Sequence, residues 1–174
     1  MTDIMTGQKD RNKMLLRDFQ DADKELLQAW LMEDHVARWY AHPEDWVYEI
    51  ENRHAEFSWI RHLIAECDGV PVGFCQYYEY RLGGEAWHGD IDTDGAYSID
   101  YLIGNRDYLG KGLGNEMVLA LIEQIAACED ARLIIVQPDE RNTASCGTLR
   151  SAGFAFDAKN KLFRLDLVEK KTES

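Results

Sequence analysis

The segment that most constrains the fold is YLGKGLGNEM, residues 108–117, which leads directly into a helical pattern. Its three glycines stand at alternate positions around a lysine: Gly110, Gly112 and Gly114. A tight turn accounts for one glycine easily and for three poorly. The start of a helix offers unpaired backbone N–H groups and the positive end of a dipole, and glycine removes the Cβ that keeps a ligand at a distance. We therefore interpret the segment as a phosphate-binding turn, to which Lys111 adds positive charge.

Two common phosphate loops do not fit this segment. The P-loop requires G-x-x-x-x-G-K-[ST], and no Gly-Lys pair here is followed by Ser or Thr. The dinucleotide fingerprint requires G-x-G-x-x-G, whereas this turn has the spacing G-x-G-x-G.

The flanking patterns predict an α+β domain with a mixed sheet. The expected elements, in chain order, are a helix in residues 21–40, a helical region near Trp46–Leu63, a hairpin of Leu63–Cys67 and Val72–Tyr80, a strand Tyr97–Gly104, the glycine turn, an amphipathic helix from Met117, the buried strand in ARLIIVQ, a short helix ended by Gly153, and a final strand in KLFRLDLV. We expect one domain over residues 1–174, with residues 1–13 as a lead-in. The tryptophans Trp39, Trp46 and Trp59 are expected in the core.

The charge balance argues against one class of partner and favours another. A net charge of −13 makes a nucleic-acid partner a poor fit, because such proteins need a basic surface. It suits a cationic small-molecule substrate, although solubility alone also explains it. Acidic residues gather in GGEAWHGDIDTDGAYSID, and this places attention on that segment.

The cysteine and hydropathy patterns indicate the cellular compartment of the protein. The four cysteines form no C-x-x-C pair and have no histidine at metal-ligand spacing, so we expect reduced thiols, no metal and a cytoplasmic location. No apolar run reaches 18 residues, which argues against a membrane partner.

Asp100 stands inside the predicted strand YSIDYLI. Aspartate is a poor strand former, and burying it costs free energy unless it has a partner. Alternation places Ser98, Asp100 and Leu102 on one face, and Ile99, Tyr101 and Ile103 on the other. Asp100 therefore either occupies an edge position or makes a structural hydrogen bond, or it binds the ammonium group of a substrate and takes its proton.

At LGKGLG the sequence resembles the acetyl-coenzyme A signature of the GCN5-related N-acetyltransferases (GNAT), Gln/Arg-x-x-Gly-x-Gly/Ala. Leu109 departs from the first position, and Gly112 and Gly114 match. The segment NTASCGTLRSAGF, residues 142–154, resembles the late helix of the family. The resemblance spans residues 63–168. It implies a mostly antiparallel sheet flanked by helices, with a central β-turn-α-β unit that binds acetyl-CoA.

Within this family, the sequence most resembles the aminoglycoside 6′-N-acetyltransferases. The first two shared features are a WL…H…W opening, here Trp30, Leu31, His35 and Trp39, and a PxGxxQxY strand, here Pro71, Gly73, Gln76 and Tyr78. The other two are an acidic loop that contains tryptophan, here residues 87–94, and an aspartate before the glycine turn, here Asp100. The resemblance implies acetyl transfer to the 6′-amine of an aminoglycoside antibiotic, and hence resistance.

The resemblance also assigns roles to residues. Acetyl-CoA is expected at Leu102, Ile103, Leu109, Gly110, Lys111, Gly112, Leu113, Gly114 and Asn142. The substrate is expected at Asp100, Trp87, Tyr78, Gln76, Gln137 and Asp139. Asp100 is the expected base, and a backbone N–H near Leu102 is expected to meet the oxyanion. Tyr78, Tyr80 and Trp87 fit the core equally well.

Two positions depart from the family pattern. Leu149 stands where many members have a tyrosine that acts as general acid, and the helix offers only Ser145 and Cys146 nearby. Gln137 stands where the aminoglycoside branch has an aspartate before a proline, and Asp139 and Glu140 follow it. A thiol with a pKa of about 8.5 leaves tolerably without an acid, so we expect a slower enzyme.

Other functions remain open at this stage. The same fold serves enzymes for other polyamine-like, hydroxylamine-bearing or protein amines, and Gln137 favours these. A sensor that binds acetyl-CoA without turnover is a third reading, supported by Leu149 and opposed by Asp100. Monomer and homodimer are equally compatible with the sequence.

Overall fold

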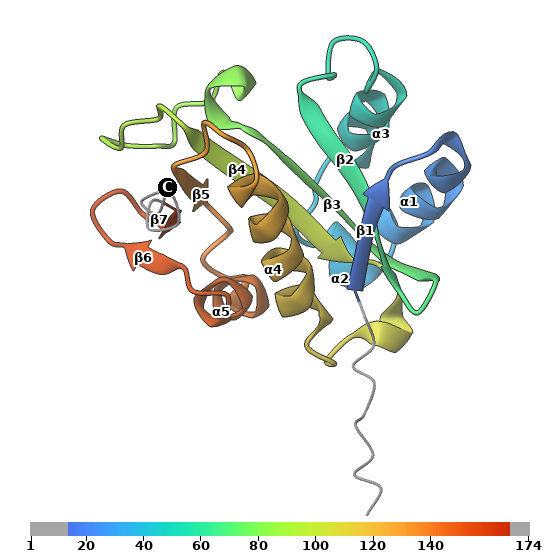
Figure 1. Cartoon of the computed structure of the whole chain (residues 1–174). Coiled ribbons are helices and arrows are strands. Elements are labelled where there is room, and N and C mark those ends of the chain that lie inside the picture. The colour runs from blue at the N-terminus through green and yellow to red at the C-terminus, as the bar shows by residue number, and fades with distance from the viewer. Residues whose placement is uncertain (1–13, 168–174) are drawn as a thin grey trace, which may run out of the picture.

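The computed structural model describes residues 14–167, which form a seven-stranded sheet with helices on both faces (Figure 1). The strands are β1 Met14–Asp18, β2 Ile60–Cys67, β3 Val70–Glu79, β4 Ala96–Ile103, β5 Leu133–Val136, β6 Ala155–Asp157 and β7 Leu162–Asp166. The helices are α1 Lys24–Leu31, α2 Asp34–Ala37, α3 Pro43–Glu51, α4 Leu113–Ala126 and α5 Thr143–Ser151, with short 3-10 turns at Asp21–Asp23, Tyr80–Gly83 and Arg106–Tyr108.

The sheet has the order β1-β2-β3-β4-β5-β7-β6, and every neighbouring pair except β4 and β5 is antiparallel. The parallel pair arises because α4 crosses from the end of β4 to the start of β5, as a β-α-β connection requires. The mixed, mostly antiparallel sheet and the central β-turn-α-β unit expected from the sequence are both confirmed.

The contact between β4 and β5 is short, and this opens the sheet. Only two register positions pair, Ala96 with Leu133 and Tyr97 with Ile134. Beyond Tyr97 the two strands diverge, and the remaining residues of β4 keep β3 as their partner on the other edge. The edge of β4 that faces β5 is therefore unpaired by any strand from residue 99 onward, and a cavity opens there.

Three hydrophobic clusters lie against the sheet, and the two larger ones cover its two faces. One contains the buried face of α4 and α5, with Met117, Leu121 and Leu149 packed on Ile99. The other contains α1 to α3, with Trp30 and Ile50 packed on Phe74 and Leu102 of the sheet. Ile99 and Leu102 thus lie on opposite faces of β4, which confirms the alternation expected for this strand.

The sequence-based element boundaries needed four corrections. The single helix expected in residues 21–40 is divided into the 3-10 turn Asp21–Asp23, α1 and α2, since α1 ends at Leu31 and α2 begins at Asp34. The predicted helical region near Trp46–Leu63 ends at Glu51, and residues 60–63 already belong to β2 because they pair with β1 and β3. Strands β1 and β6 were not predicted, since each is short and its pattern is set by its neighbour in the sheet. The expected lead-in, residues 1–13, lies outside the described residues.

Within residues 14–167, none of the helices combines the length and the apolar character that crossing a bilayer demands.

Candidate active site

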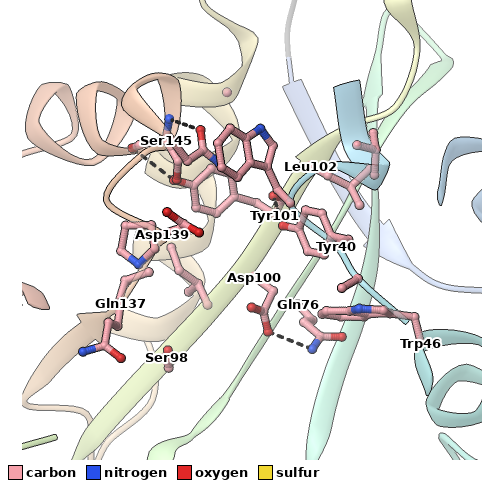
Figure 2. Close-up of a pocket in the computed structure, with 18 of the residues that line it drawn as sticks. Tyr40, Trp46, Gln76, Ser98, Asp100, Tyr101, Leu102, Gln137, Asp139 and Ser145 are labelled. Carbon is pink, nitrogen blue, oxygen red and sulfur yellow. Dashed lines mark hydrogen bonds between the residues drawn. The ribbon is translucent and has the colours of Figure 1, made fainter. Parts of the chain in front are cut away.

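A cavity of about 920 Å³ opens where β4 and β5 diverge. Its floor is formed by residues 98–103 of β4, and its walls come from the helical segment 35–49 on one side and from the start of α4 and α5 on the other. Figure 2 shows the side chains of these elements converging on β4. Because the cavity continues from the glycine turn to Asp100, it can hold a long cosubstrate and an acceptor in one site.

Asp100 points into this cavity and is held by one side-chain partner (Figure 2). Gln76 lies opposite it on β3, and its Nε2 donates a hydrogen bond of 3.0 Å to Asp100 Oδ2. Burial raises the pKa of Asp100 to about 6, partly offset by the hydrogen bond from Gln76. Gln76 itself is 2% exposed, so the pair is rigidly placed. A carboxylate with this pKa is ionised at pH 7 and is a better base than an ordinary aspartate.

Two further carboxylates add negative charge to the cavity. Glu49 of α3 and Glu85 both line it, and their negative charges contribute to the raised pKa of Asp100. Glu49 Oε1 lies 2.9 Å from His62 Nε2, which fixes its position. The arrangement favours a cationic acceptor, whose ammonium group would lower the cost of keeping these charges close together.

The open edge of β4 presents backbone groups of alternate residues. Gly104 N–H bonds to Val72 on the β3 side, whereas Gly95 C=O accepts from the β5 side, so Tyr101 and Ile103 turn their backbone toward the cavity. Leu102 turns its backbone toward β3; the expected oxyanion donor near Leu102 therefore corresponds to the N–H of a neighbour. Tyr40 donates to the carbonyl of Tyr101, and His35 Nε2 lies 2.9 Å from the carbonyl of Ile103.

The glycine turn forms a cradle that side chains would fill. Gly110 and Gly112 have φ of +70° and +75°, a conformation that costs other residues free energy, and a Cβ at either position would meet no protein atom within 4 Å. Gly112 is the N-cap of α4, so the first N–H groups of a 14-residue helix point into this open space. The donor set and the space fit a pyrophosphate.

Not every residue of the turn faces the cavity. Of the turn, Leu109 and Gly114 line the cavity, and Gly110, Lys111 and Gly112 lie beyond its lining. Leu113 is 6% exposed and belongs to the core, so only its backbone is available to a ligand. The ammonium group of Lys111 lies 5.4 Å from the centre of the Tyr108 ring. Gly114 sits in the first turn of α4 facing Thr148 of α5, where a Cβ would make only ordinary contacts.

Gly112→Ala is expected to weaken acetyl-CoA binding about tenfold or more, because the new methyl group enters the phosphate cradle and the left-handed backbone is strained by about 1–2 kcal/mol. Gly69→Ala is the matched control: its φ is +79°, its surroundings are equally open, and it lies in the β2–β3 hairpin. Calorimetric titration should show weaker binding for the first variant alone. Equal affinity of both would show that the turn does not carry the phosphates.

The residues expected around the acceptor all line the cavity, but they differ in the partners that hold their side chains. Tyr78 lines the cavity beside Trp59, with ring centres 5.5 Å apart, and Trp87 lines it while donating to Glu85. Gln137 lines the opposite wall, where its amide donates to the carbonyl of Lys161. Asp139 reaches the rim, but Arg141 pairs with it at 2.7 Å and holds its pKa at about 2.

Asn142 and the acidic loop need separate comment. Asn142 lines the cavity and caps α5 by accepting the N–H of Ser145. The acidic loop 87–94 contributes only Trp87 to the cavity. Its carboxylates pair with basic groups elsewhere: Asp90 with Lys159, Asp92 with Arg132 and Asp94 with Arg81.

Sequence reasoning missed several residues that the fold brings to the site. The three tryptophans Trp39, Trp46 and Trp59, expected in the core, are partly exposed and line the cavity. Tyr40 and Tyr101 were assigned no role, yet both line the cavity, and Tyr101 bonds to Ser145. Leu149 is fully buried in the core and has no access to a ligand. The only signal in the sequence was the density of aromatic residues in these segments.

A family model described as "Acetyltransferase (GNAT) domain" matches residues 20–162. The chain belongs to the GNAT family of acetyltransferases. This membership accounts for the open edge of β4 and for the glycine turn at the start of α4. It also confirms the family resemblance drawn from residues 109–114 and 142–154.

Curated relatives within GNAT include aminoglycoside N(6′)-acetyltransferases. The type 1 enzyme of Klebsiella pneumoniae is 28% identical over 158 residues, which cover 87% of this chain and 77% of that one, and the Serratia marcescens enzyme has the same values. A probable spermine N(1)-acetyltransferase of Bacillus subtilis subsp. natto is 33% identical over 95 residues, covering 51% of this chain and 61% of the relative.

Solved structures give the same fold. The crystal structure of AAC(6′)-Ib in complex with coenzyme A superposes with a TM-score of 0.77 at 24% identity, covering 88% of this chain and 95% of that one. The same enzyme in complex with coenzyme A and kanamycin gives a TM-score of 0.73 at 25% identity over the same shares.

Proposed function

We propose that this GNAT protein transfers the acetyl group of acetyl-CoA to the 6′-amine of aminoglycosides, and so confers resistance to them. The observation that carries the proposal is Asp100, a half-buried carboxylate with a pKa of about 6 in a cavity that extends to Leu109 and Gly114 of the glycine turn. The named activity of the relatives from Klebsiella pneumoniae and Serratia marcescens supports the choice of acceptor. None of the four cysteines forms a disulfide within residues 14–167, which supports a cytoplasmic location.

Acetyl-CoA fits the donor half of the cavity. Its pyrophosphate would rest on the backbone of residues 109–114, and its pantetheine arm would run along the open edge of β4 at residues 101–103. A ligand that pairs with this edge would share or displace the contacts that Tyr40 and His35 make to it. Asn142 and Gly114 line the same half.

Asp100 and its neighbours supply the acceptor chemistry. The acidic group of Asp100, Glu49 and Glu85 binds the substrate as a cation, and Asp100 then takes the proton that the ammonium must lose before it can attack. As the amine adds to the thioester carbonyl, negative charge develops on the oxygen. The backbone N–H groups of Tyr101 or Ile103, on the open edge, are placed to stabilise that charge.

A polyamine such as spermine is the second candidate acceptor, favoured by one observation. Gln137 occupies the wall where the resemblance places a carboxylate, and its amide donates a hydrogen bond to the carbonyl of Lys161. The cavity then offers one cation site near Asp100 rather than two. The match to the probable spermine acetyltransferase agrees with this reading.

Thiol release from acetyl-CoA should be measured against kanamycin, ribostamycin, a matched aminoglycoside with a 6′-hydroxyl, and spermine. We expect release with the 6′-amino compounds and none with the 6′-hydroxyl compound, because only an amine can lose its proton to Asp100 and attack. Release with spermine alone would move the proposal to polyamines. Silence with every amine, while acetyl-CoA still binds, would overturn the enzymatic proposal.

A further inference from the structure

Tyr101 reaches from β4 to the helix α5 across the gap in the sheet (Figure 2). Its hydroxyl lies 2.6 Å from Ser145 Oγ, where either oxygen can be the donor, and it makes a longer contact of 3.4 Å as donor to the Ser145 carbonyl. When Ser145 Oγ donates, the short hydrogen bond leaves the phenol proton available to a ligand. Burial raises the pKa of Tyr101 to about 12, so the phenol keeps its proton throughout the neutral range. The pair lines the cavity, yet the acceptor chemistry described above does not use it.

The position of Tyr101 along β4 places it between the two halves of the site. Asp100, which takes the proton of the amine, precedes it, and Ile103 and the glycine turn follow it. A cosubstrate whose phosphates rest on the turn and whose acetyl group reaches Asp100 must pass the side chain of Tyr101. The sulfur is the last atom before the acetyl group, so it lies in this stretch.

The two other phenols on this part of the cavity wall, Tyr40 and Tyr78, are engaged or lie farther from the glycine turn. Tyr40 gives its proton to the carbonyl of Tyr101. Tyr78 hydrogen-bonds Ser98, farther from the glycine turn along the sheet. Leu149, one helical turn beyond Ser145 on α5, carries no proton and is fully buried.

We propose that Tyr101, oriented by Ser145, donates a hydrogen bond to the sulfur of coenzyme A as it leaves, and so replaces the donor that α5 lacks at Leu149. The proposal rests on the acetyl transfer proposed above. In this step the C–N bond has formed, the C–S bond breaks and its electron pair stays on sulfur. The nitrogen loses two protons in all: the ammonium gives the first to Asp100 before the attack, and Asp100 passes it to water, while the adduct gives the second to water as it collapses. The released thiolate takes one proton from water.

Tyr101→Phe is expected to lower kcat roughly 10²-fold, as the loss of one donor to a developing anion does, while the KM for acetyl-CoA stays within about threefold. Tyr77→Phe is the matched control, because it removes a half-buried phenol from the adjacent strand outside the cavity. That variant should keep the kcat of the wild type. Equal kcat values for Tyr101→Phe and wild type would overturn the proposal.

A structural role for Tyr101 would also lower kcat, so a second measurement separates the two. A fluorinated tyrosine at position 101 has a more acidic phenol, which loses its proton at lower pH and then cannot donate. The alkaline limb of kcat should move to lower pH with this residue and stay in place with the same residue at position 77. An unmoved limb contradicts the proposal.

A third measurement does not depend on turnover. With carbon-13 at tyrosine Cζ, the Tyr101 resonance is assigned by its absence in Tyr101→Phe. Coenzyme A should shift it, and an analogue that lacks the sulfur should shift it much less. Equal shifts would overturn the contact with sulfur. If wild type acetylates no amine, the proposed function fails, and this comparison still decides whether Tyr101 meets the sulfur; if wild type is active and the shifts are equal, only the role of Tyr101 fails.

Discussion

Replacing Asp100 by Asn is expected to lower kcat/KM for the amine by roughly 10²–10⁴-fold at pH 7.5, the range typical of a lost general base. Asn keeps an oxygen that can accept the hydrogen bond from Gln76, so the geometry of the site is preserved while the proton acceptor is lost. Asp90→Asn is the control, since that carboxylate pairs with Lys159 outside the cavity. Unchanged turnover in Asp100→Asn would remove Asp100 from the chemistry.

The pKa of Asp100 also fixes the direction of two pH effects. The carboxylate must be ionised to accept a proton, so kcat/KM of the wild type should fall below about pH 6, and this limb should vanish in Asp100→Asn. Because the folded pKa of Asp100 is above the unfolded value, the contribution of this residue to the free energy of unfolding should fall as pH rises from about 4 to 6 and stay level above. Asp100→Asn should therefore be more stable at pH 7.5, by about 1–3 kcal/mol in urea unfolding.

Replacing Gly73 by Ala is expected to destabilise the protein by about 3 kcal/mol or more, because overpacking here cannot relax. The new Cβ would lie 2.2 Å from the carbonyl oxygen of Leu102 and 2.7 Å from Met117 Cε. The first contact is with backbone, so β4 itself would have to move. Urea unfolding should show a lower midpoint, and activity should fall with it, since Asp100 and Tyr101 lie on the displaced strand.

Gly147→Ala serves as the control for Gly73→Ala, with the opposite expected sign. Gly147 lies in α5, and a Cβ there meets no atom within 4 Å. Alanine is the better helix former, so this variant should be more stable by about 0.5–1 kcal/mol. A Gly73→Ala protein as stable as the wild type would show that β3, β4 and α4 are packed less closely than the structure has them.

The elements that could be predicted from sequence are those set by interactions between residues close together in the chain. The turn at residues 109–114 could be predicted because the glycine spacing and the helix that follows are both local features. Gly110 and Gly112 do adopt the left-handed backbone that favours glycine. The helix α4 and the strands β2 to β5 have their own periodicity. The end of α3 and the strands β1 and β6 were mispredicted because partners distant in sequence decide them.

The sequence by itself determined the order of the elements from β2 to α5, the glycine turn before α4 and an aspartate that needs a partner within a strand. Only the tertiary structure decided that Gln76 is that partner, that the three tryptophans face a cavity, and that Tyr101 meets Ser145. The physical reason is the short pairing of β4 with β5, which stops after Tyr97. The gap between β4 and β5 depends on how the other neighbours of each strand hold it in place. No local sequence pattern in either strand predicts such a gap.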